Sequence, residues 1–338
     1  MLLLALLASG CMGVGGPKPG APAHHRERGF ANTSPTFTRP PFWTRIGFFV
    51  TRMAQTTFSP RTAAFPIAAN DGAALRANAG AATVTWVGHA TLLVQVDGLN
   101  VLTDPQWSVR ASPLSFAGPK RVTPPAVPFE ALPPIHVVVI SHDHYDHLDV
   151  TTVRRLAAEH QPRFLVPLGM KQWFADLGIP DVEELDWWDA RTVRGVTFTC
   201  VPAQHFAQRS LWDGNRRLWA GWTMAGRERR LFFAGDTAYF DGFKEIGARL
   251  GPFDLAAIPI GAYLPPVIMK QVHTDPADAL AVFDDVRARA MIPIHWGTFD
   301  LAEEPLEQPP VILERLARER GLGPDRVWIF KHGETRRW

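Results

Sequence analysis

Residues 141–149 read Ser-His-Asp-His-Tyr-Asp-His-Leu-Asp, so three histidines and three aspartates occupy nine consecutive positions. They follow the apolar, β-branched run 135–140, which is typical of a strand buried on both faces of a sheet. Asp149 is a good helix N-cap, and the apolar residues behind it recur at helical spacing through Ala157. In α/β sheets, ligands gather in loops at the carboxyl ends of strands. The stretch therefore predicts a ligand-binding loop between a buried strand and a helix.

The residue types in this loop indicate a metal site. Imidazole and carboxylate are ligands that zinc accepts, and both are dense here. His142 and His144 can converge on one ion, while Asp146 and His147 turn toward a second. Solubility alone would not require such a cluster.

Three further candidate ligands lie where other apolar runs end. His205 follows a run that ends at Cys200, Asp236 follows Gly235, which permits a tight turn, and His295 follows the run 291–294. Each alone would be an ordinary loop residue. Together they recur at the ends of predicted buried strands, which is the geometry that a shared metal site needs.

The surrounding pattern predicts an α/β fold. Predicted strands span residues 83–87, 90–96, 100–103, 135–140, 196–200, 231–234, 255–260 and 291–294. Predicted helices begin after Asp149 and after Asp275, where Pro276 occupies the first helical position, and another spans 42–58. We expect this last helix to lie on the domain or on a membrane surface. Buried strands alternating with amphipathic helices favour sheets covered by helices.

Composition limits the class of protein. The 338 residues suffice for one large α/β domain or two ordinary ones, and 46% apolar with 20% charged residues is typical of a globular protein. A net charge of +2 argues against a dedicated nucleic-acid binder. The two cysteines, Cys11 and Cys200, exclude a disulfide scaffold beyond one bridge, and we expect Cys200 to be a small buried apolar residue.

The motif order resembles the metallo-β-lactamase superfamily, with its His-x-His-x-Asp-His run, a lone His, an Asp after Gly and a final His. Thr103-Asp104-Pro105 resembles the upstream Asp motif of that superfamily. From about residue 83 to the end, the chain is similar to N-acylphosphatidylethanolamine-hydrolysing phospholipase D and its bacterial relatives. The similar stretches are 86–91, 141–149, 233–237, 251–263, 273–276 and 294–299.

This resemblance implies a four-layer αβ/βα sandwich with two zinc ions, although iron or manganese could replace zinc. The residues that match the family's ligands are His142, His144 and His205 for one ion, and Asp146, His147 and His295 for the other, with Asp236 bridging. Asp146 would also orient the nucleophile, and His273 falls where the family has a histidine near the scissile phosphate. Asp104 would stand behind the ligands.

The implied activity is that of a phosphodiesterase of the phospholipase D type. It would release N-acylethanolamine and phosphatidic acid from an N-acylated phosphatidylethanolamine. The implied partners are a phospholipid substrate and a membrane surface, with a homodimer possible and no nucleic acid.

The first residues suggest export. Residues 1–10 form an apolar run too short to span a bilayer, and residues 8–11 resemble a lipoprotein processing site that ends at Cys11. We therefore expect a signal over residues 1–11, a tether and N-terminal extension over 12–80, and a hydrolase domain over 81–338. The protein would be a periplasm-facing lipoprotein of the bacterial envelope, anchored through Cys11. No basic residue precedes the apolar run, so a buried N-terminal helix or a different start is the alternative.

Two other functions remain open at the level of sequence. A lactonase or esterase acting on a phosphorylated sugar lactone would use the same metal ligands, because these do not distinguish attack on carbonyl carbon from attack on phosphorus. A non-catalytic metal-binding envelope lipoprotein is a second alternative, although a binding module has no need of an open site for two metals.

Overall fold

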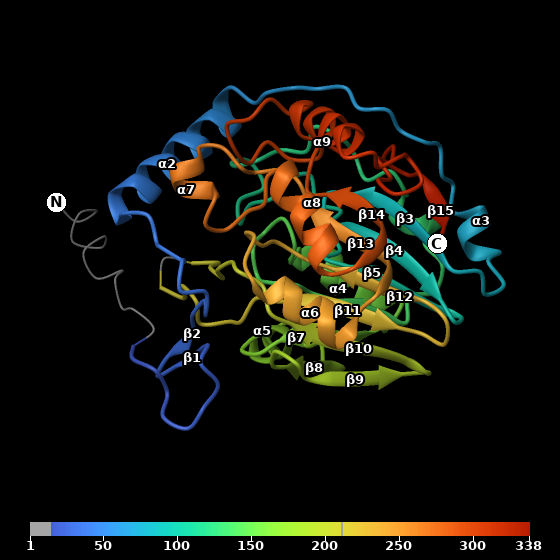
Figure 1. Ribbon diagram of the computed structural model, residues 1–338, viewed down its shortest axis with the longest axis horizontal. Coiled ribbons are helices and arrows are strands. Elements are labelled where there is room, and N and C mark those ends of the chain that lie inside the picture. The colour runs from blue at the N-terminus through green and yellow to red at the C-terminus, as the bar shows by residue number, and fades with distance from the viewer. Residues whose placement is uncertain (1–14, 211) are drawn as a thin grey trace.

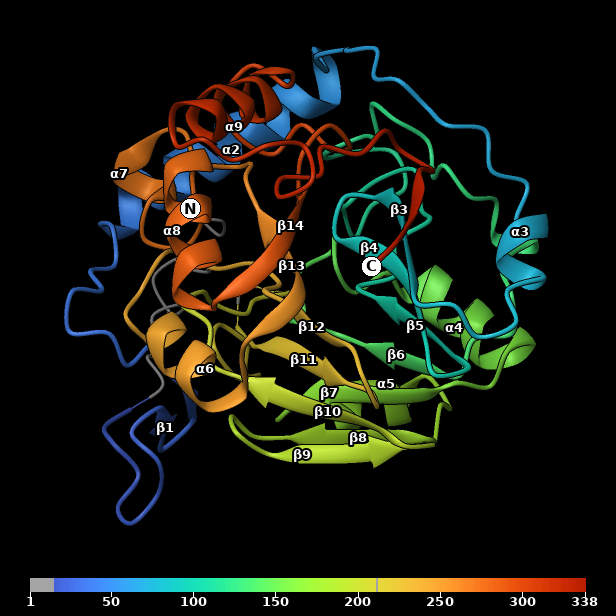
Figure 2. The same ribbon diagram turned by 45° about the vertical axis from the view of Figure 1, so that its right-hand side comes forward.

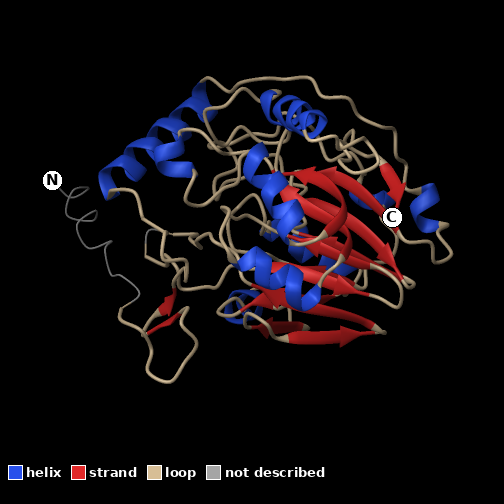
Figure 3. Ribbon diagram, in the orientation of Figure 1, coloured by secondary structure: helices blue, strands red, loops and turns tan. Residues whose placement is uncertain are grey.

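Two β-sheets form the centre of the molecule, and helices cover their outer faces (Figure 1, Figure 3). The structure is a computed structural model that describes residues 15–210 and 212–338. The predicted lipoprotein segment, including Cys11, lies outside these residues. Within the described ranges, none of the helices combines the length and apolar character needed to span a bilayer.

The first sheet has seven strands and is mixed. In spatial order it contains β15 (Thr335–Arg337), β3 (Thr83–Gly88), β4 (Thr91–Val96), β5 (Leu99–Thr103), β6 (Val137–Val139), β7 (Arg163–Pro167) and β8 (Val182–Leu185). The strands from β15 to β5 pair antiparallel, and those from β5 to β8 pair parallel.

The second sheet has six strands and is also mixed. Its order is β14 (Ala288–Ile294), β13 (Phe253–Pro259), β12 (Arg230–Phe233), β11 (Gly221–Ala225), β10 (Val196–Val201) and β9 (Ala190–Val193). Strands β12, β13 and β14 pair parallel, and the others pair antiparallel.

The helices lie outside the sheets. The described helices are α2 (Phe42–Phe58), α3 (Ala73–Arg76), α4 (Val150–Glu159), α5 (Lys171–Asp176), α6 (Gly242–Leu250), α7 (Pro266–Met269), α8 (Pro276–Asp285) and α9 (Gln308–Glu319), with a 3-10 turn at Phe129–Ala131. Helices α6 and α8 lie over the six-stranded sheet, and α4 lies beside the seven-stranded one (Figure 2). The predicted helix starts are confirmed, because the Asp149 side chain accepts from the N–H of Thr151 and the Asp275 side chain accepts from those of Ala277 and Asp278.

Strand β6 shows why a continuous apolar run is needed here. Val137 and Val139 belong to the core between the sheets, whereas Val138 and Ile140 pack with the inner faces of α4 and α5. Successive side chains on a strand point to opposite faces, so a strand covered on both sides must be apolar throughout. The predicted sandwich of two sheets covered by helices is confirmed, as is the burial of Cys200.

The N-terminal extension runs along the domain rather than apart from it (Figure 2). Its short hairpin, β1 (His25–Arg26) with β2 (Gly29–Phe30), is attached through Asp186, whose carboxylate oxygens lie 2.6 Å from His24 Nε2 and 2.7 Å from His25 Nε2. Further on, the Ala68 N–H donates to the carbonyl of His332 at 2.8 Å. The extension therefore contacts the domain at both of its ends.

Candidate metal centre

Every predicted metal ligand lies on a loop that leaves the carboxyl end of a strand. The loop 141–149 follows β6, and His205, Asp236 and His295 follow β10, β12 and β14. The seven-stranded sheet thus supplies the ligands of the loop 141–149, and the six-stranded sheet supplies His205, Asp236 and His295. All of them meet at the same edge of the sandwich.

The first ligand group consists of His142, His144 and His205. One ring nitrogen of each lies within 4.8 Å of one nitrogen of the other two, with His144 Nδ1 at 2.8 Å from His142 Nε2 and 3.3 Å from His205 Nε2. The His205 Nδ1–H donates to the carbonyl of Val272 at 2.7 Å, which leaves Nε2 facing the other two rings. This is the trio that the resemblance assigns to one ion.

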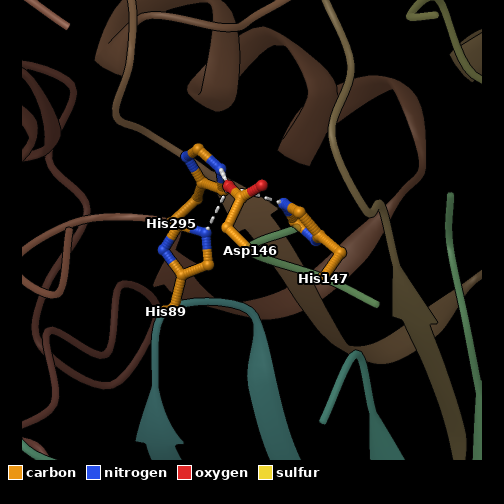
Figure 4. Close-up of side chains that lie close together, drawn as sticks. All are labelled: His89, Asp146, His147 and His295. Carbon is orange, nitrogen blue, oxygen red and sulfur yellow. Dashed lines mark hydrogen bonds and ion pairs between the residues drawn. The ribbon is translucent and has the colours of Figure 1, made fainter. Parts of the chain in front are cut away.

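The second group contains Asp146, His147 and His295, and it also includes His89 (Figure 4). Oδ2 of Asp146 lies 3.3 Å from His147 Nε2, 3.4 Å from His295 Nε2 and 2.9 Å from His89 Nε2. His89 was missed as a site residue in the sequence, since it is a single histidine after Gly88 at the end of β3. Its place in the similar stretch 86–91 was the available signal.

Asp236 stands between the two groups. Its Oδ2 lies 3.1 Å from His295 Nε2 and 3.2 Å from His147 Nε2, and 3.9 Å from Nε2 of both His142 and His205. One carboxylate thus faces ligands of both groups, as the predicted bridging role requires. Gly235, with φ of +61°, makes the turn that aims it inward.

His273 joins the same cluster. It is buried, and its Nδ1 lies 3.8 Å from Asp236 Oδ2 without a hydrogen-bond partner. It precedes the cap of α8, so the helix start holds it toward the site. The structure therefore places all eight predicted site residues together.

The donor atoms at the centre have the character of a cation site. Four buried atoms have no hydrogen-bond partner in residues 15–210 and 212–338: His147 Nε2, His295 Nε2, His273 Nδ1 and Asp236 Oδ1. Buried polar atoms are nearly always paired, so a group of unpaired donor atoms that face one point calls for a ligand. Imidazole and carboxylate together suit zinc and related divalent ions. The residues fit two bound metal ions.

Burial keeps part of the histidine set neutral. It lowers the pKa of His205 and of His273 to about 3, and that of His144 to about 4. A neutral imidazole offers the lone pair that a metal requires.

Two histidines of the cluster, His147 and His295, have raised pKa values instead. Burial acts to lower the pKa of both histidines, but the carboxylates of Asp236 and Asp146 outweigh it. The pKa of His147 is therefore held well above its ordinary value, and the pKa of His295 is raised to about 9. Burial likewise opposes ionisation of the two carboxyls, yet His147 and His295 hold the pKa of each well below its usual range. The centre therefore attracts positive charge, which divalent ions would supply.

Asp104 orients one ligand from behind, as expected. Its Oδ2 lies 2.7 Å from His147 Nδ1, and its Oδ1 accepts from the N–H of Ser141 at 2.7 Å. A carboxylate bonded to the outer ring nitrogen fixes the orientation of the inner nitrogen.

Asp143 supports the loop rather than facing the centre. It is fully buried, accepts from the N–H of Gln208 at 2.8 Å, and forms an ion pair with Arg217 at 2.9 Å. Arg217 also pairs with Asp213 at 2.8 Å. This network fastens the ligand loop of one sheet to the segment that carries His205.

The N-terminal extension contributes Asn32 to the same segment. Its Nδ2 donates to the carbonyl of His205 at 2.8 Å, and its Oδ1 accepts from the N–H of His205 at 3.1 Å and from Trp219 Nε1 at 3.1 Å. Both backbone groups of a candidate ligand are thus held by one side chain. No sequence motif pointed to this residue.

The sequence matches the β-lactamase superfamily domain over residues 99–296. It is 49% identical over 228 residues to N-acyl-phosphatidylethanolamine-hydrolyzing phospholipase D 1 of Caenorhabditis elegans, which covers 64% of this chain and 64% of that protein. A mitochondrial enzyme of the same name from Saccharomyces cerevisiae is 34% identical over 258 residues, covering 74% of this chain and 55% of that one. The chain therefore spans less than two thirds of these relatives.

Other relatives match over their whole length. A metal-dependent hydrolase of Pyrobaculum arsenaticum is 30% identical over 258 residues, covering 75% of this chain and 98% of that protein.

Among solved structures, isothiocyanate hydrolase from Delia radicum gut bacteria superposes with a TM-score of 0.61 at 20% identity, covering 76% of this chain and 98% of that one. The diiron β-hydroxylase CmlA from Streptomyces venezuelae superposes with a TM-score of 0.57 at 19% identity, covering 77% and 55%.

These structural likenesses show the fold alone. The domain match extends over more than half of the chain, and it includes the strands from β5 to β14 and most of the ligand set. The chain belongs to the metallo-β-lactamase superfamily of metal-dependent hydrolases.

Proposed function

We propose that this chain is a dinuclear zinc phosphodiesterase of the phospholipase D type that hydrolyses N-acylphosphatidylethanolamine-like lipids. The observation that carries the proposal is the position of Asp236, a single carboxylate that faces both ligand groups. The likeness to the nematode and yeast enzymes supports this choice of substrate.

In this proposal each ligand group would hold one ion. His142, His144 and His205 would hold one, while Asp146, His147 and His295 would hold the other, with Asp236 shared. When bound, two metal ions supply an activated water and neutralise charge on phosphoryl oxygens. Zinc is our choice because of the donor set, and iron is the alternative since the fold neighbour CmlA is a diiron protein.

The chain's own residues would position the reacting groups. In the reaction, the oxygen of water bonds to phosphorus, the bond from phosphorus to the ethanolamine oxygen breaks, and that oxygen takes a proton. Asp146, whose Oδ2 is held by His89, would orient the nucleophile. His273 Nδ1 has no hydrogen-bond partner among the described residues, and it would bind a phosphoryl oxygen or the leaving oxygen. The buried setting strengthens each of these contacts.

Metal analysis and a lipid assay on one sample test the proposal. The full chain should contain two zinc ions and release N-acylethanolamine from N-acylated phosphatidylethanolamine in mixed micelles. Asp236→Ala should fold, retain less metal and lose turnover. Asp254→Ala is the matched control, because in the described part of the chain its side chain bonds Arg229 and the backbone of Arg230, away from the ligand cluster.

Each alternative result has a defined meaning. Two metals without lipid turnover, but with hydrolysis of a phosphorylated sugar lactone or another ester, would replace the phosphodiesterase by the lactonase. Full activity of Asp236→Ala would refute the ligand assignment. Two iron ions in the active protein would correct the metal only.

The proposed location is the bacterial envelope, through acylation of Cys11. Mass spectrometry of the protein from membranes should find a diacylated Cys11 at the new N-terminus. A chain that starts at Met1 and stays in the soluble fraction would refute this part of the proposal.

A further inference from the structure

A second group of metal-ligating side chains lies outside the metal centre, where the N-terminal extension meets the domain (Figure 1). It consists of His24 and His25 at the start of the hairpin β1–β2 and of Asp186, which directly follows β8. We call these three residues the hairpin site. One ligand atom of each residue lies within 4.8 Å of those of the other two. Two imidazoles and a carboxylate form a donor set that suits zinc and related divalent ions.

The chain turns so that both rings reach the same carboxylate. Side chains of successive residues in an extended chain point to opposite sides. His24 instead lies in the turn that precedes β1, and Nε2 of His24 and of His25 lie 2.6 Å and 2.7 Å from the two oxygens of Asp186. The two ring centroids are 4.6 Å apart, and the ring planes meet at 73°. This local turn therefore brings the three donor groups together.

An ion would require the donor atoms to move apart by a fraction of an ångström. With bonds of about 2.0–2.1 Å to zinc, tetrahedral ligand atoms lie about 3.3 Å apart, roughly 0.7 Å more than the contacts found here. Donor atoms are similarly close at the metal centre itself, where His142 Nε2 and His144 Nδ1 lie 2.8 Å apart. The hairpin site thus needs an adjustment similar to that of the first ligand group.

Neighbouring groups fix the orientation of the hairpin site. The N–H of Trp187 donates to Asp186 Oδ1 at 2.8 Å, and the N–H of Asp186 donates to Asp189 Oδ2 at 2.9 Å. The buried ring of His24 stacks on that of Trp187, with 4.1 Å between the centroids. Supporting contacts of this kind hold metal ligands in place and are part of a built site.

The charge at the hairpin site also favours a cation. In residues 15–210 and 212–338, the ion pairs of Asp186 are those with His24 and His25. Neutral rings would donate hydrogen bonds to this carboxylate without supplying positive charge, and Asp189 adds a second carboxylate next to it. A partly buried carboxylate is stabilised by a positive charge at close range. A divalent ion would supply that charge.

Solvent reaches the hairpin site from an open cavity. His24 and Trp187 line this cavity of about 470 Å³, which also borders Thr33 and Pro202. The side chain of His25 is 17% exposed. Three protein ligands leave at least one coordination position of zinc for water. The cavity thus provides the entry path that a metal site needs, and its water would complete the coordination.

The hairpin site is linked to His205 through a short stretch of chain. The N–H of Ala31 donates to the carbonyl of His24 at 2.9 Å, directly before Asn32. Asn32 in turn holds both backbone groups of His205. An ion that fastens the hairpin would therefore also stabilise the position of a candidate ligand of the metal centre.

We propose that His24, His25 and Asp186 bind a third divalent ion, for which the donor set suits zinc, and that this ion fastens the N-terminal extension to the domain. The hairpin site is partly exposed and has no carboxylate shared between two ions, so we expect its ion to exchange more readily than the pair at the metal centre. Binding at the hairpin site does not depend on the proposed function. Its effect on turnover rests on that function, because the effect acts through His205.

Zinc titration of the full chain tests the hairpin site directly. The parent chain carries Cys11→Ser and no histidine tag, so that neither binds zinc, and Cys200 is buried. The protein is dialysed against metal-free buffer, and elemental analysis counts the ions that remain. Calorimetry at neutral pH then counts the ions that bind on addition of zinc chloride.

Two variants each remove one ligand of the hairpin site, His25→Gln and Asp186→Asn. His136→Asn is the matched control, because His136 is also a partly exposed histidine, and its Nδ1 accepts the N–H of Asn100 away from the ligand groups. We expect the parent and the control to bind one zinc ion more than the pair. Both ligand variants should bind this ion at least tenfold more weakly. Equal zinc binding in all four proteins, or no third ion in the parent with zinc in large excess, would overturn the proposal.

Trypsin measures whether the ion fastens the hairpin. Zinc should slow cleavage after Arg26 and Arg28 about tenfold in the parent, since an ion present at about ten times its Kd reduces local opening by that factor. The rate in Asp186→Asn should not respond to zinc. Equal slowing in both proteins would mean that zinc acts on trypsin or at another place, and no slowing in the parent would mean that the ion does not fasten the hairpin. Either result would overturn the proposal.

Turnover separates this inference from the proposed function. Filling the hairpin site should raise the turnover of N-acylated phosphatidylethanolamine in the parent and in His136→Asn, but not in His25→Gln. If the third ion binds and protects the hairpin while no lipid is cleaved in any form, the hairpin site stands and the proposed substrate is wrong. If lipid is cleaved by a chain that binds only the pair of ions, the proposed function stands and the hairpin site is refuted.

Discussion

Asn32 lies 173 positions before His205 in the chain, yet it holds both backbone groups of that candidate ligand. Asn32→Leu keeps a similar volume and removes these hydrogen bonds. We expect metal affinity or activity to fall by about 10–100-fold, the range seen when the support of a ligand is lost. The rate of zinc loss to a chelator, together with kcat, measures this effect.

Asn70→Leu is the control for Asn32. Asn70 also lies in the N-terminal extension and donates to a backbone carbonyl, that of Gly333, at 2.8 Å, away from the ligand cluster. It should change thermal stability without changing zinc release. If both variants release zinc alike, Asn32 has no specific role in positioning His205.

Gly235 is the second residue at which the site depends on local geometry. A Cβ there would lie 2.6 Å from Ser141 Cβ and 3.0 Å from the carbonyl oxygen of Ala220, at a φ of +61°. Gly235→Ala should therefore cost about 1–3 kcal/mol in strain, shift Asp236 and reduce bound metal. Gly195→Ala has the same kind of positive φ, +89°, but meets nothing within 4 Å. Elemental analysis should find full metal in Gly195→Ala alone, and equal metal in both would contradict the role of Gly235.

At the residue scale, the sequence predicted most of the centre because the ligands sit next to recognisable strand ends. The loop 141–149 is local, so its spacing alone placed four ligands. His89 and Asn32 escaped because each acts through contacts with residues far away in the chain. No period or spacing in the sequence encodes such contacts.

At the scale of elements, one carboxylate bonds both histidines at the start of the hairpin β1–β2, whose other end is held by the Phe30 N–H bond to Asn215. Burial opposes the charge of Asp186, but His24 and His25 bond its oxygens and lower its pKa below the ordinary value. A lowered pKa means that this attachment is fully present above the pKa of an unfolded Asp, about 3.9, and is lost as the pH falls through the lower folded value. Trypsin should thus cut after Arg26 or Arg28 slowly at neutral pH, and faster when it is added directly after a pulse to a pH below the lowered pKa of Asp186.

Asp186→Asn provides the comparison. It should expose the hairpin to trypsin already at neutral pH, with little further effect of acid. A hairpin that resists trypsin equally in both proteins, at both pH values, would show that other contacts hold it.

Strands and helices were predictable where both faces of a strand are buried, or where buried side chains recur at helical spacing. The runs around β6, β12, β13 and β14 are apolar because both faces are covered, and the α4 and α8 starts carry their caps in the sequence. Strand β9 was not predicted, since at the sheet edge its residues Ala190, Arg191 and Thr192 are exposed and show no apolar pattern. Helix α2 was predicted, but its outward apolar face could be recognised only after the domain was seen to pack against the opposite side.

On the scale of the whole molecule, the candidate ligands link the two sheets. The loop after β6 supplies four of them, and His205, Asp236 and His295 come from the other sheet. Removal of metal would leave buried carboxylates and imidazoles that face one another without compensation. We expect a chelator to lower Tm, because a ligand present at 1,000 times its Kd stabilises the folded state by about 4 kcal/mol.

Calorimetry with chelator, followed by added zinc, checks this prediction. Tm should recover when zinc returns. An unchanged Tm in protein shown by elemental analysis to be free of metal would mean that the sheets hold together without the ions.

The N-terminal extension and the first strands have a practical consequence for anyone who divides this protein into pieces. A fragment cut at the limits of the matched domain, 99–296, would begin at the first residue of β5 and omit β15, β3 and β4. Such a fragment would lose His89 and Asn32 and would leave β5 with an unpaired edge, ready to pair with other chains. A screen that expresses this fragment would therefore obtain aggregated, inactive protein, although the full chain folds.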